Sequence, residues 1–357
     1  ISYDLKYYLP EVKNLETAFG ISGMRQSNEN LGREFLIPDY HLADNGIFAS
    51  LKKSFELTTL NAGLRYDHRN ISTDVLIQDS LELFNAFERN YSSISASAGI
   101  THKLSKKLDL KANIGRGFRS PNIPELASNG IHEGTQRYEV GNNNLKPETS
   151  LQFDFGISYD SKSIEFSLNL FLNNIDNFIY SRNINEEQIT IDGISYPLYR
   201  YVQGQSTLKG GEFTLDIHPI KNLHFENSLS FVHGQNEAID EPLPFIPPMK
   251  VVNELKYEIP SKSSKRFQDS YIKIELVSSL TQNRLDLFET KTKGYSLMNV
   301  GIGSNLKISK QTAVLFARVS NLFNTSYFDH LSRLKEVGIN GTGRNLSIGL
   351  MLPIGIK

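Results

Sequence analysis

The residues best suited to chemistry in this 357-residue sequence are histidines, and most of the eight lie in or beside long polar segments. His132 stands next to Glu133 in one such segment, and His330 lies in the last one. Imidazole and carboxylate groups that converge can bind a transition metal, and one imidazole can ligate haem iron. The alternative is that these histidines are solvated polar side chains. Three more histidines lie near expected strand ends: His41, His68 and His233.

Two further candidates lie in the same long segment as His132. Pro121 cannot continue a β-ladder, so it ends a strand just after Arg119. Arg119 then pairs with a loop carboxylate or with an anionic ligand. Tyr138 is one of several aromatic residues in the polar segments; its ring can stack on a flat ligand such as a porphyrin, or belong to an interfacial girdle.

Composition and motifs argue against an enzyme. The sequence has no Gly-x-Ser-x-Gly elbow, no His-Glu-x-x-His pair and no phosphate-binding loop. The absence of cysteine excludes thiolate metal sites, disulfides and cysteine nucleophiles. The formal net charge of -1, from 38 Lys+Arg and 39 Asp+Glu, argues against nucleic acid as the main partner. We expect no catalytic residue and no intrinsic cofactor.

Alternation of apolar and polar residues dominates the chain. Leu151, Phe153 and Phe155 alternate with Gln152 and Asp154, and the same period of two recurs in segments from residue 108 to residue 352. Period two is the mark of strands with one apolar and one polar face. The sequence therefore predicts an all-β fold, either a membrane barrel with its apolar face outward or a soluble sandwich with its apolar face inward.

Connection lengths favour the barrel. Tight turns are expected near residues 10, 54, 105, 160–163, 219–222 and 309, alternating with long polar segments at 27–40, 73–89, 120–148, 183–198, 234–247, 282–293 and 324–343. Outer-membrane barrels have short turns at one end and long loops at the other. Counting gives about fifteen strands, many longer than a sandwich strand. Complete bacterial barrels have even counts, so we expect barrel strands to precede residue 1.

Several motifs resemble one family. Residues 117–126 (GFRSPNIPEL) and 138–148 (YEVGNNNLKPE) resemble the box of TonB-dependent receptor barrels. Further matches are residues 210–213 (GGEF), 242–248 (PLPFIPP), 319–324 (VSNLFN) and 343–345 (GRN). The resemblance covers nearly the whole chain. It implies a transmembrane antiparallel β-barrel of about 22 strands, of which residues 1–357 are the C-terminal part, about 15 strands without the plug domain.

The resemblance also implies a function, expected here for the whole protein. Such receptors take up a metal chelate, haem or a metal ion across the bacterial outer membrane, driven by the TonB–ExbB–ExbD complex through an N-terminal region. The other expected partners are the plug domain, outer-membrane lipids and the transported ligand. Haem receptors of the family use a histidine between the two boxes, and His132 occupies such a position. The expected ligand-binding residues are His132, Glu133, Arg119, Tyr138 and His330, with His132 and Glu133 as metal ligands for haem, a ferric siderophore or zinc.

One alternative keeps the barrel but changes its use. A passive outer-membrane channel or an adhesin-like barrel without energy coupling would need the same alternating strands. An upstream plug would separate it from an importer.

Overall fold

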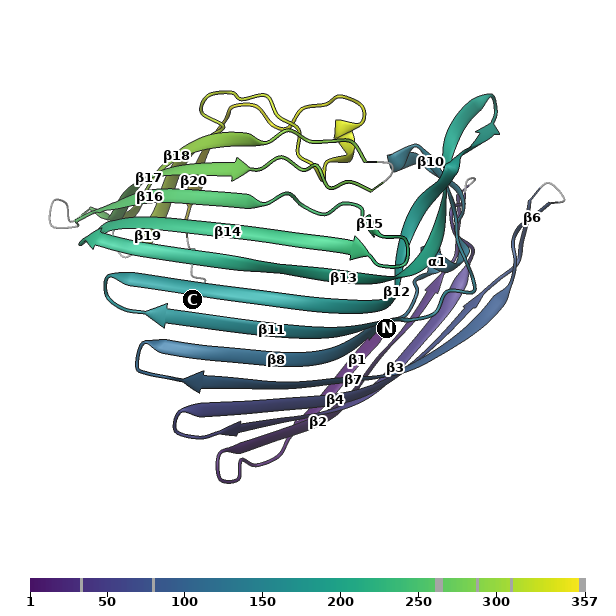
Figure 1. Cartoon of the computed structure of the whole chain (residues 1–357), viewed down its shortest axis with the longest axis horizontal. Coiled ribbons are helices and arrows are strands. Elements are labelled where there is room, and N and C mark those ends of the chain that lie inside the picture. Colours follow the sequence, from purple (N-terminus) through teal and green to yellow (C-terminus); the bar gives the residue numbers. More distant parts are fainter. Residues whose placement is uncertain (33–34, 79–80, 261–265, 287–288, 309–310, 353–357) are drawn as a thin grey trace.

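The computed structural model describes residues 1–32, 35–78, 81–260, 266–286, 289–308 and 311–352. One curved antiparallel sheet dominates it (Figure 1). Of the 18 strands in that sheet, β9, β10 and β15 are short loop strands and the other fifteen form the wall. The wall strands are β1 (Ser2–Tyr8), β2 (Leu15–Asn28), β3 (Tyr40–Ser54), β4 (Thr58–Thr73), β7 (Phe87–Lys103), β8 (Leu108–Arg119), β11 (Glu148–Asp160), β12 (Ile164–Ile191), β13 (Ile194–Ile220), β14 (Leu223–Asn236), β16 (Lys250–Ile259), β17 (Phe267–Ser279), β18 (Tyr295–Ile308), β19 (Gln311–Ser320) and β20 (Asn345–Met351).

Each wall strand pairs with the wall strands before and after it in the sequence, always antiparallel. Within the described residues β1 pairs only with β2 and β20 only with β19, so the sheet forms an open trough. The predicted all-β fold and the predicted fifteen strands are confirmed. Simple up-and-down order follows from tight turns, which leave each strand beside its predecessor.

The two ends of the wall differ as predicted. One end, the turn end, carries the short connections 9–14, 55–57, 104–107, 161–163 and 221–222. The other, the loop end, carries 29–39, 74–86, 120–147, 237–249, 280–294 and 321–344. These contain β5 (Leu76–Gln78), β6 (Leu81–Phe84), α1 (Ile123–Ala127), β9 (Asn129–His132), η1 (Glu133–Thr135), β10 (Arg137–Val140), β15 (Glu241–Pro242) and η3 (Arg333–Lys335). The turn predicted near residue 309 lies outside the described residues.

One predicted loop is wrong. Residues 183–198 continue β12 and β13 as a hairpin that projects beyond the other wall strands (Figure 1). Its tip is Asp192–Gly193, both with positive φ, which is the conformation of a two-residue hairpin turn. The register shifts between Asn183 and Gln188, and this bulge interrupts the alternation from which the sequence analysis recognised strands.

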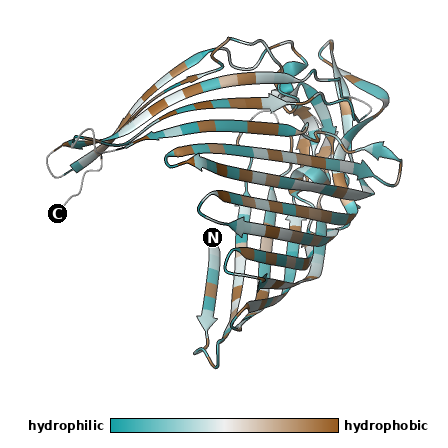
Figure 2. Ribbon diagram, turned by 60° about the vertical axis from the view of Figure 1, so that its left-hand side comes forward, coloured by the Kyte–Doolittle hydropathy of each residue, from teal (hydrophilic) through white to brown (hydrophobic). Residues whose placement is uncertain are grey.

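The wall is a single layer with two chemically different faces, as the banded hydropathy of its strands indicates (Figure 2). Phe153, Phe155 and Ile302 are 42%, 43% and 55% exposed, although they are large and apolar. Ion pairs of 2.8 Å join Lys273 to Glu254 and Arg318 to Glu275. Because no second layer covers these apolar side chains in the described residues, the soluble sandwich interpretation is wrong.

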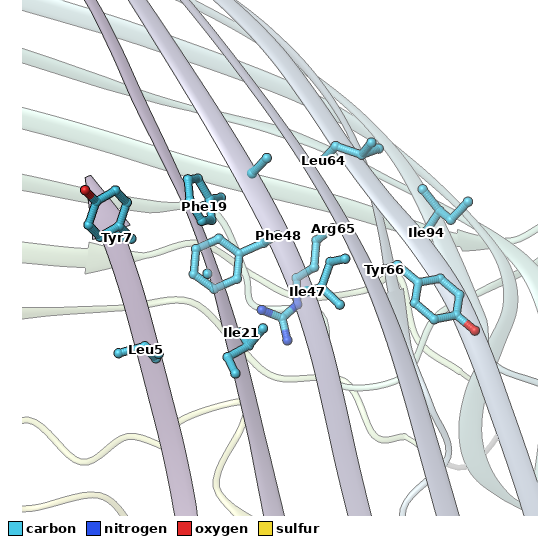
Figure 3. A pocket seen from close by; sticks show the side chains of 12 residues that line it. Leu5, Tyr7, Phe19, Ile21, Ile47, Phe48, Leu64, Arg65, Tyr66 and Ile94 are labelled. Carbon is cyan, nitrogen blue, oxygen red and sulfur yellow. The ribbon is translucent and has the colours of Figure 1, made fainter. Parts of the chain in front are cut away.

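Exposed apolar side chains continue onto the first strands. Leu5 and Tyr7 of β1 lie beside Phe19 and Ile21 of β2 and Ile47 of β3 around a shallow apolar depression (Figure 3). This depression belongs to the face that bears Phe153 and Phe155, here called the outer face. We do not assign it to a ligand, because exposed apolar side chains of the same phase recur on most wall strands.

A small apolar core fixes which face is concave. Ile123 and Leu126 of α1 pack in one cluster with Leu42 of β3, Ile71 of β4 and Ile179 of β12. β3 and β12 are several strands apart in the sheet, so only a concave face can bring both to one short helix. This face, here called the inner face, also carries the charged residues. No helix in the described residues is long and apolar enough to span a membrane.

Candidate ligand site at the loop end

The connection between β8 and β11 folds back into the trough because its sequence starts a short helix. Pro121 ends the strand, and the Asn122 side chain accepts a hydrogen bond of 2.8 Å from the Glu125 backbone N–H. The Glu125 carboxylate accepts in return from the Asn122 N–H at 2.8 Å. This capping box fixes the first turn of α1, and it turns Ile123 and Leu126 into the apolar core.

Arg119 locks both ends of this connection. Its guanidinium donates to Glu125 at 2.8 Å and to Glu148, the first residue of β11, at 2.6 Å and 2.8 Å. Glu148 also accepts from the Ile179 N–H of β12 at 2.6 Å. The sequence predicted that Arg119 pairs with a loop carboxylate or with an anionic ligand, and the structure contains the pairs with carboxylates. In this position Arg119 positions the loop, and a contact with a ligand stays a prediction.

The hairpin β9–β10 is fastened to the extension of β13. β10 pairs in parallel with Leu198–Arg200 of β13. Glu139, only 2% exposed, accepts from Arg137 at 2.7 Å and from the Tyr201 hydroxyl at 3.0 Å. Arg137 also lies 4.6 Å from the centre of the Tyr199 ring. These contacts hold the hairpin in one position.

Tyr138 lies inside this hairpin. Its hydroxyl donates to the Asn129 side chain at 2.9 Å, and burial raises the pKa of Tyr138 above its ordinary value. The hydroxyl therefore stays a neutral donor with a partner in the same hairpin. Contact between Tyr138 and a ligand is untested and stays a prediction.

His132 and Glu133 lie at the end of this fastened hairpin. His132 is half-buried and closes β9, and Glu133 is exposed and opens η1. The Nδ1 atom of His132 is buried without a hydrogen-bond partner. Among the described residues, no third His, Cys, Asp or Glu joins these two in a group that could hold a metal ion. His132 and Glu133 are thus two neighbouring potential donors, and their contact with a ligand stays a prediction.

His330 lies on a different connection, between β19 and β20. It is 5% exposed, its Nδ1 lies 2.8 Å from the Thr292 hydroxyl, and its Nε2 lies 3.5 Å from Glu289. Burial lowers the pKa of His330, so the ring is neutral at pH 7. It joins connections 280–294 and 321–344. The described contacts do not bring His330 together with His132, so the two predicted ligands are separate.

A second polar group at the loop end was not predicted from the sequence. Arg284 donates to Gln235 at 2.7 Å and to the ring of His233 at 2.7 Å. Arg182 of β12 pairs with Glu241 at 2.5 Å. Tyr180 accepts from Asn236 at 2.7 Å. Only the fold joins these residues, because the partners lie about 50 to 60 positions apart in the sequence. The one feature of the sequence that pointed to this group was the position of His233 near a strand end.

The fold and the loop-end contacts define a class of protein: an antiparallel barrel wall with an apolar outer face, a charged inner face and folded loops at one end. The profile of the family described as "TonB dependent receptor-like, beta-barrel" matches residues 11–322. The chain belongs to this family. The family consists of receptors and transporters, and its barrels are outer-membrane proteins.

Curated relatives agree with the assignment. The chain is 24% identical over 349 residues to the ferric enterobactin receptor of Pseudomonas aeruginosa, covering 91% of this chain and 42% of that receptor. It is 25% identical over 350 residues to the TonB-dependent heme receptor A of Haemophilus ducreyi, covering 88% of this chain and 46% of that receptor. The chain thus spans less than half the length of these relatives.

Solved structures share the fold. The copper transporter OprC superposes with a TM-score of 0.78 at 19% identity, over 97% of this chain and 55% of that one. The siderophore receptor PirA from Acinetobacter baumannii superposes with a TM-score of 0.60 at 17% identity, over 98% of this chain and 61% of that one. At these identities the likeness concerns the fold alone.

Proposed function

We propose that this chain is the barrel wall of an outer-membrane receptor that imports a metal chelate, haem or a metal ion by TonB-dependent active transport. The observation that carries the proposal is the single-layer wall of a TonB-dependent receptor barrel, with its large apolar side chains uncovered on the outer face. An uncovered apolar face is stable against lipid, and the ion-paired inner face is stable against water or a polar domain. The turn end would face the periplasm and the loop end the outside.

The open trough is consistent with a larger barrel. Residues 1–357 would supply about fifteen strands of about 22, and the remaining strands and a plug domain would complete the lumen. The inner face would then contact the plug through residues such as Lys111 and Asp154. A TonB box near the plug would connect the receptor to the TonB–ExbB–ExbD complex. No catalytic step is proposed.

The ligand would be a chelate and would meet the β9–β10 hairpin first. His132 and Glu133 offer two donors on a fastened hairpin, which is too few for a bare ion that needs four to six. Haem and ferric siderophores bring most donors themselves, so one imidazole completes the coordination of haem iron. His132 would be the contacting residue, with Glu133 beside it. Arg119, Tyr138 and His330 would act by holding the loops in place, and zinc is the least favoured cargo.

Growth on defined metal sources tests this proposal. In a strain lacking the gene, the full-length protein should restore growth on haem or on a ferric siderophore as sole iron source. His132→Ala should remove growth on haem while leaving surface expression unchanged. His68→Ala is the matched control, because His68 is a half-buried wall imidazole bonded to Ser92. Restored growth on none of haem, ferric siderophores or zinc would refute the proposed ligand class.

The passive alternative is tested in the same strain. If uptake persists after tonB is deleted, the barrel is a channel without energy coupling. If uptake stops, active transport is supported.

A further inference from the structure

A second histidine cluster lies at the turn end, opposite the ligand loops. Asp216 and His218 stand two residues apart near the end of β13, and His224 follows the tight turn into β14. Their neighbours Ile217 and Phe225 pair directly with each other and carry the apolar alternation. The cluster therefore lies on the inner face.

The three side chains are already gathered closely enough to share an ion. Asp216 Oδ2 lies 2.9 Å from His218 Nε2 and 3.4 Å from His224 Nδ1. One donor atom from each residue lies within 4.8 Å of the others. The two rings meet edge to face with centres 4.4 Å apart. This is the only group of three potential ligands that the described residues form.

The local chemistry favours a cation. The Oδ1 atom of Asp216 is buried without a partner, which is costly for a carboxylate oxygen unless a cation or donor approaches it. Glu165 pairs directly across from Asp216. Glu258 lies 3.9 Å from His224, and its carboxylate pairs with Lys256 at 2.7 Å. The carboxylates of Asp216 and Glu258 thus lie within 4 Å of the two rings.

We propose that Asp216, His218 and His224 bind a divalent first-row transition-metal ion such as Zn²⁺, Cu²⁺ or Ni²⁺ on the inner face at the turn end. Two imidazoles and one carboxylate are ligands that these ions prefer, and three ligands leave positions open for water or for a passing molecule. The proposal stands whatever the loops import. In the orientation proposed above, the ion would sit at the periplasmic mouth of the barrel.

Metal titration of the full-length receptor tests this site. The protein, purified in detergent without a histidine tag, should bind one Zn²⁺ or Cu²⁺ per chain in calorimetry. His218→Asn and His224→Asn should each weaken binding at least tenfold, as expected for loss of one of three ligands. His102→Asn is the matched control, because His102 lies at the same end and bonds only Thr58 in the described structure. It should bind like the wild type.

Copper spectroscopy keeps the test decisive if a variant folds poorly. The electron paramagnetic resonance spectrum of wild-type protein with one equivalent of Cu²⁺ should show coupling to two imidazole nitrogens. Because protons compete with the metal ion for imidazole nitrogen, binding should weaken as the pH falls. Absence of nitrogen coupling, or unchanged affinity in the His218→Asn/His224→Asn double variant, would overturn the site. Either result leaves the import proposal untouched, since uptake is measured separately.

Discussion

Replacing Arg119 by alanine should release the connection between β8 and β11 from the trough. The guanidinium holds two carboxylates, Glu125 and Glu148, whose side chains are only 11% and 12% exposed. Removing one partner of a buried ion pair costs about 3–5 kcal/mol. The Arg119 side chain is itself 42% exposed, so water replaces part of the lost interaction and we expect about 2 kcal/mol.

Hydrogen exchange read by mass spectrometry measures this cost locally. A loss of about 2 kcal/mol in the free energy of local opening corresponds to roughly thirtyfold faster exchange of the amides in α1. Arg119→Lys keeps the charge but cannot hold both carboxylates in a fork, so it should fall between alanine and wild type. Arg116→Ala is the matched control, because Arg116 lies three residues earlier in β8 and contacts the Ile94 carbonyl instead of a carboxylate.

The exchange pattern decides the matter. Faster exchange should be confined to residues 120–147 and should spare connection 280–294. Exchange in α1 at the wild-type rate in Arg119→Ala would refute the clamp, and equal acceleration everywhere would show that Arg119 supports the wall instead of the loop.

Three further predictions follow from single contacts. Burial lowers the pKa of His330, so His330 binds a proton more readily when the loops open than when they are closed. The free energy of loop opening should therefore be highest above about pH 6.5 and should decrease as the pH falls below it. His330→Asn should abolish this pH dependence in the hydrogen exchange of residues 289–293. Gly193→Ala, at φ 81, should cost roughly 1–2 kcal/mol of backbone strain and accelerate exchange only at the β12–β13 tip, so a protected tip would contradict the turn assignment. Phe155→Lys should destabilise the barrel in vesicles by about 2–4 kcal/mol in urea titrations. Gln152→Lys should be tolerated, because the lysine can pair with Asp154 on the inner face. Equal effects of the two substitutions would argue against a lipid-facing outer face and a polar inner face.

The wall could be predicted because its signal is local. Phe153 and Asp154 differ in side-chain chemistry at adjacent positions, and this alternation recurs wherever lipid and water lie on opposite sides of one strand. Connection lengths are equally readable, because turns at one end need only two to six residues. The hairpin at residues 183–198 was not predicted because the register shift between Asn183 and Gln188 interrupts the alternation.

The candidate sites depend on contacts that sequence does not contain. Arg119 meets Glu148 across 29 positions, and His330 meets Thr292 across 38; neither partner follows from spacing along the chain. The Asp216 cluster had a readable signal, since residues 216 and 218 share a face and a tight turn returns the chain to His224. It was not predicted because the cluster lies beside a tight turn, whereas the predicted ligands are histidines in long loops.

Side-chain accessibility along β11 tests the central claim most directly. Residues 1–357 contain no cysteine, so single cysteines at residues 152, 153, 154 and 155 of the full-length protein can carry spin labels without background once any cysteine outside residues 1–357 is replaced by serine. In lipid vesicles, labels at 153 and 155 should collide with oxygen dissolved in the bilayer, and labels at 152 and 154 with a water-soluble nickel chelate. Labels at 153 and 155 that both reagents fail to reach, or that only the chelate reaches, would contradict a wall whose apolar face meets lipid.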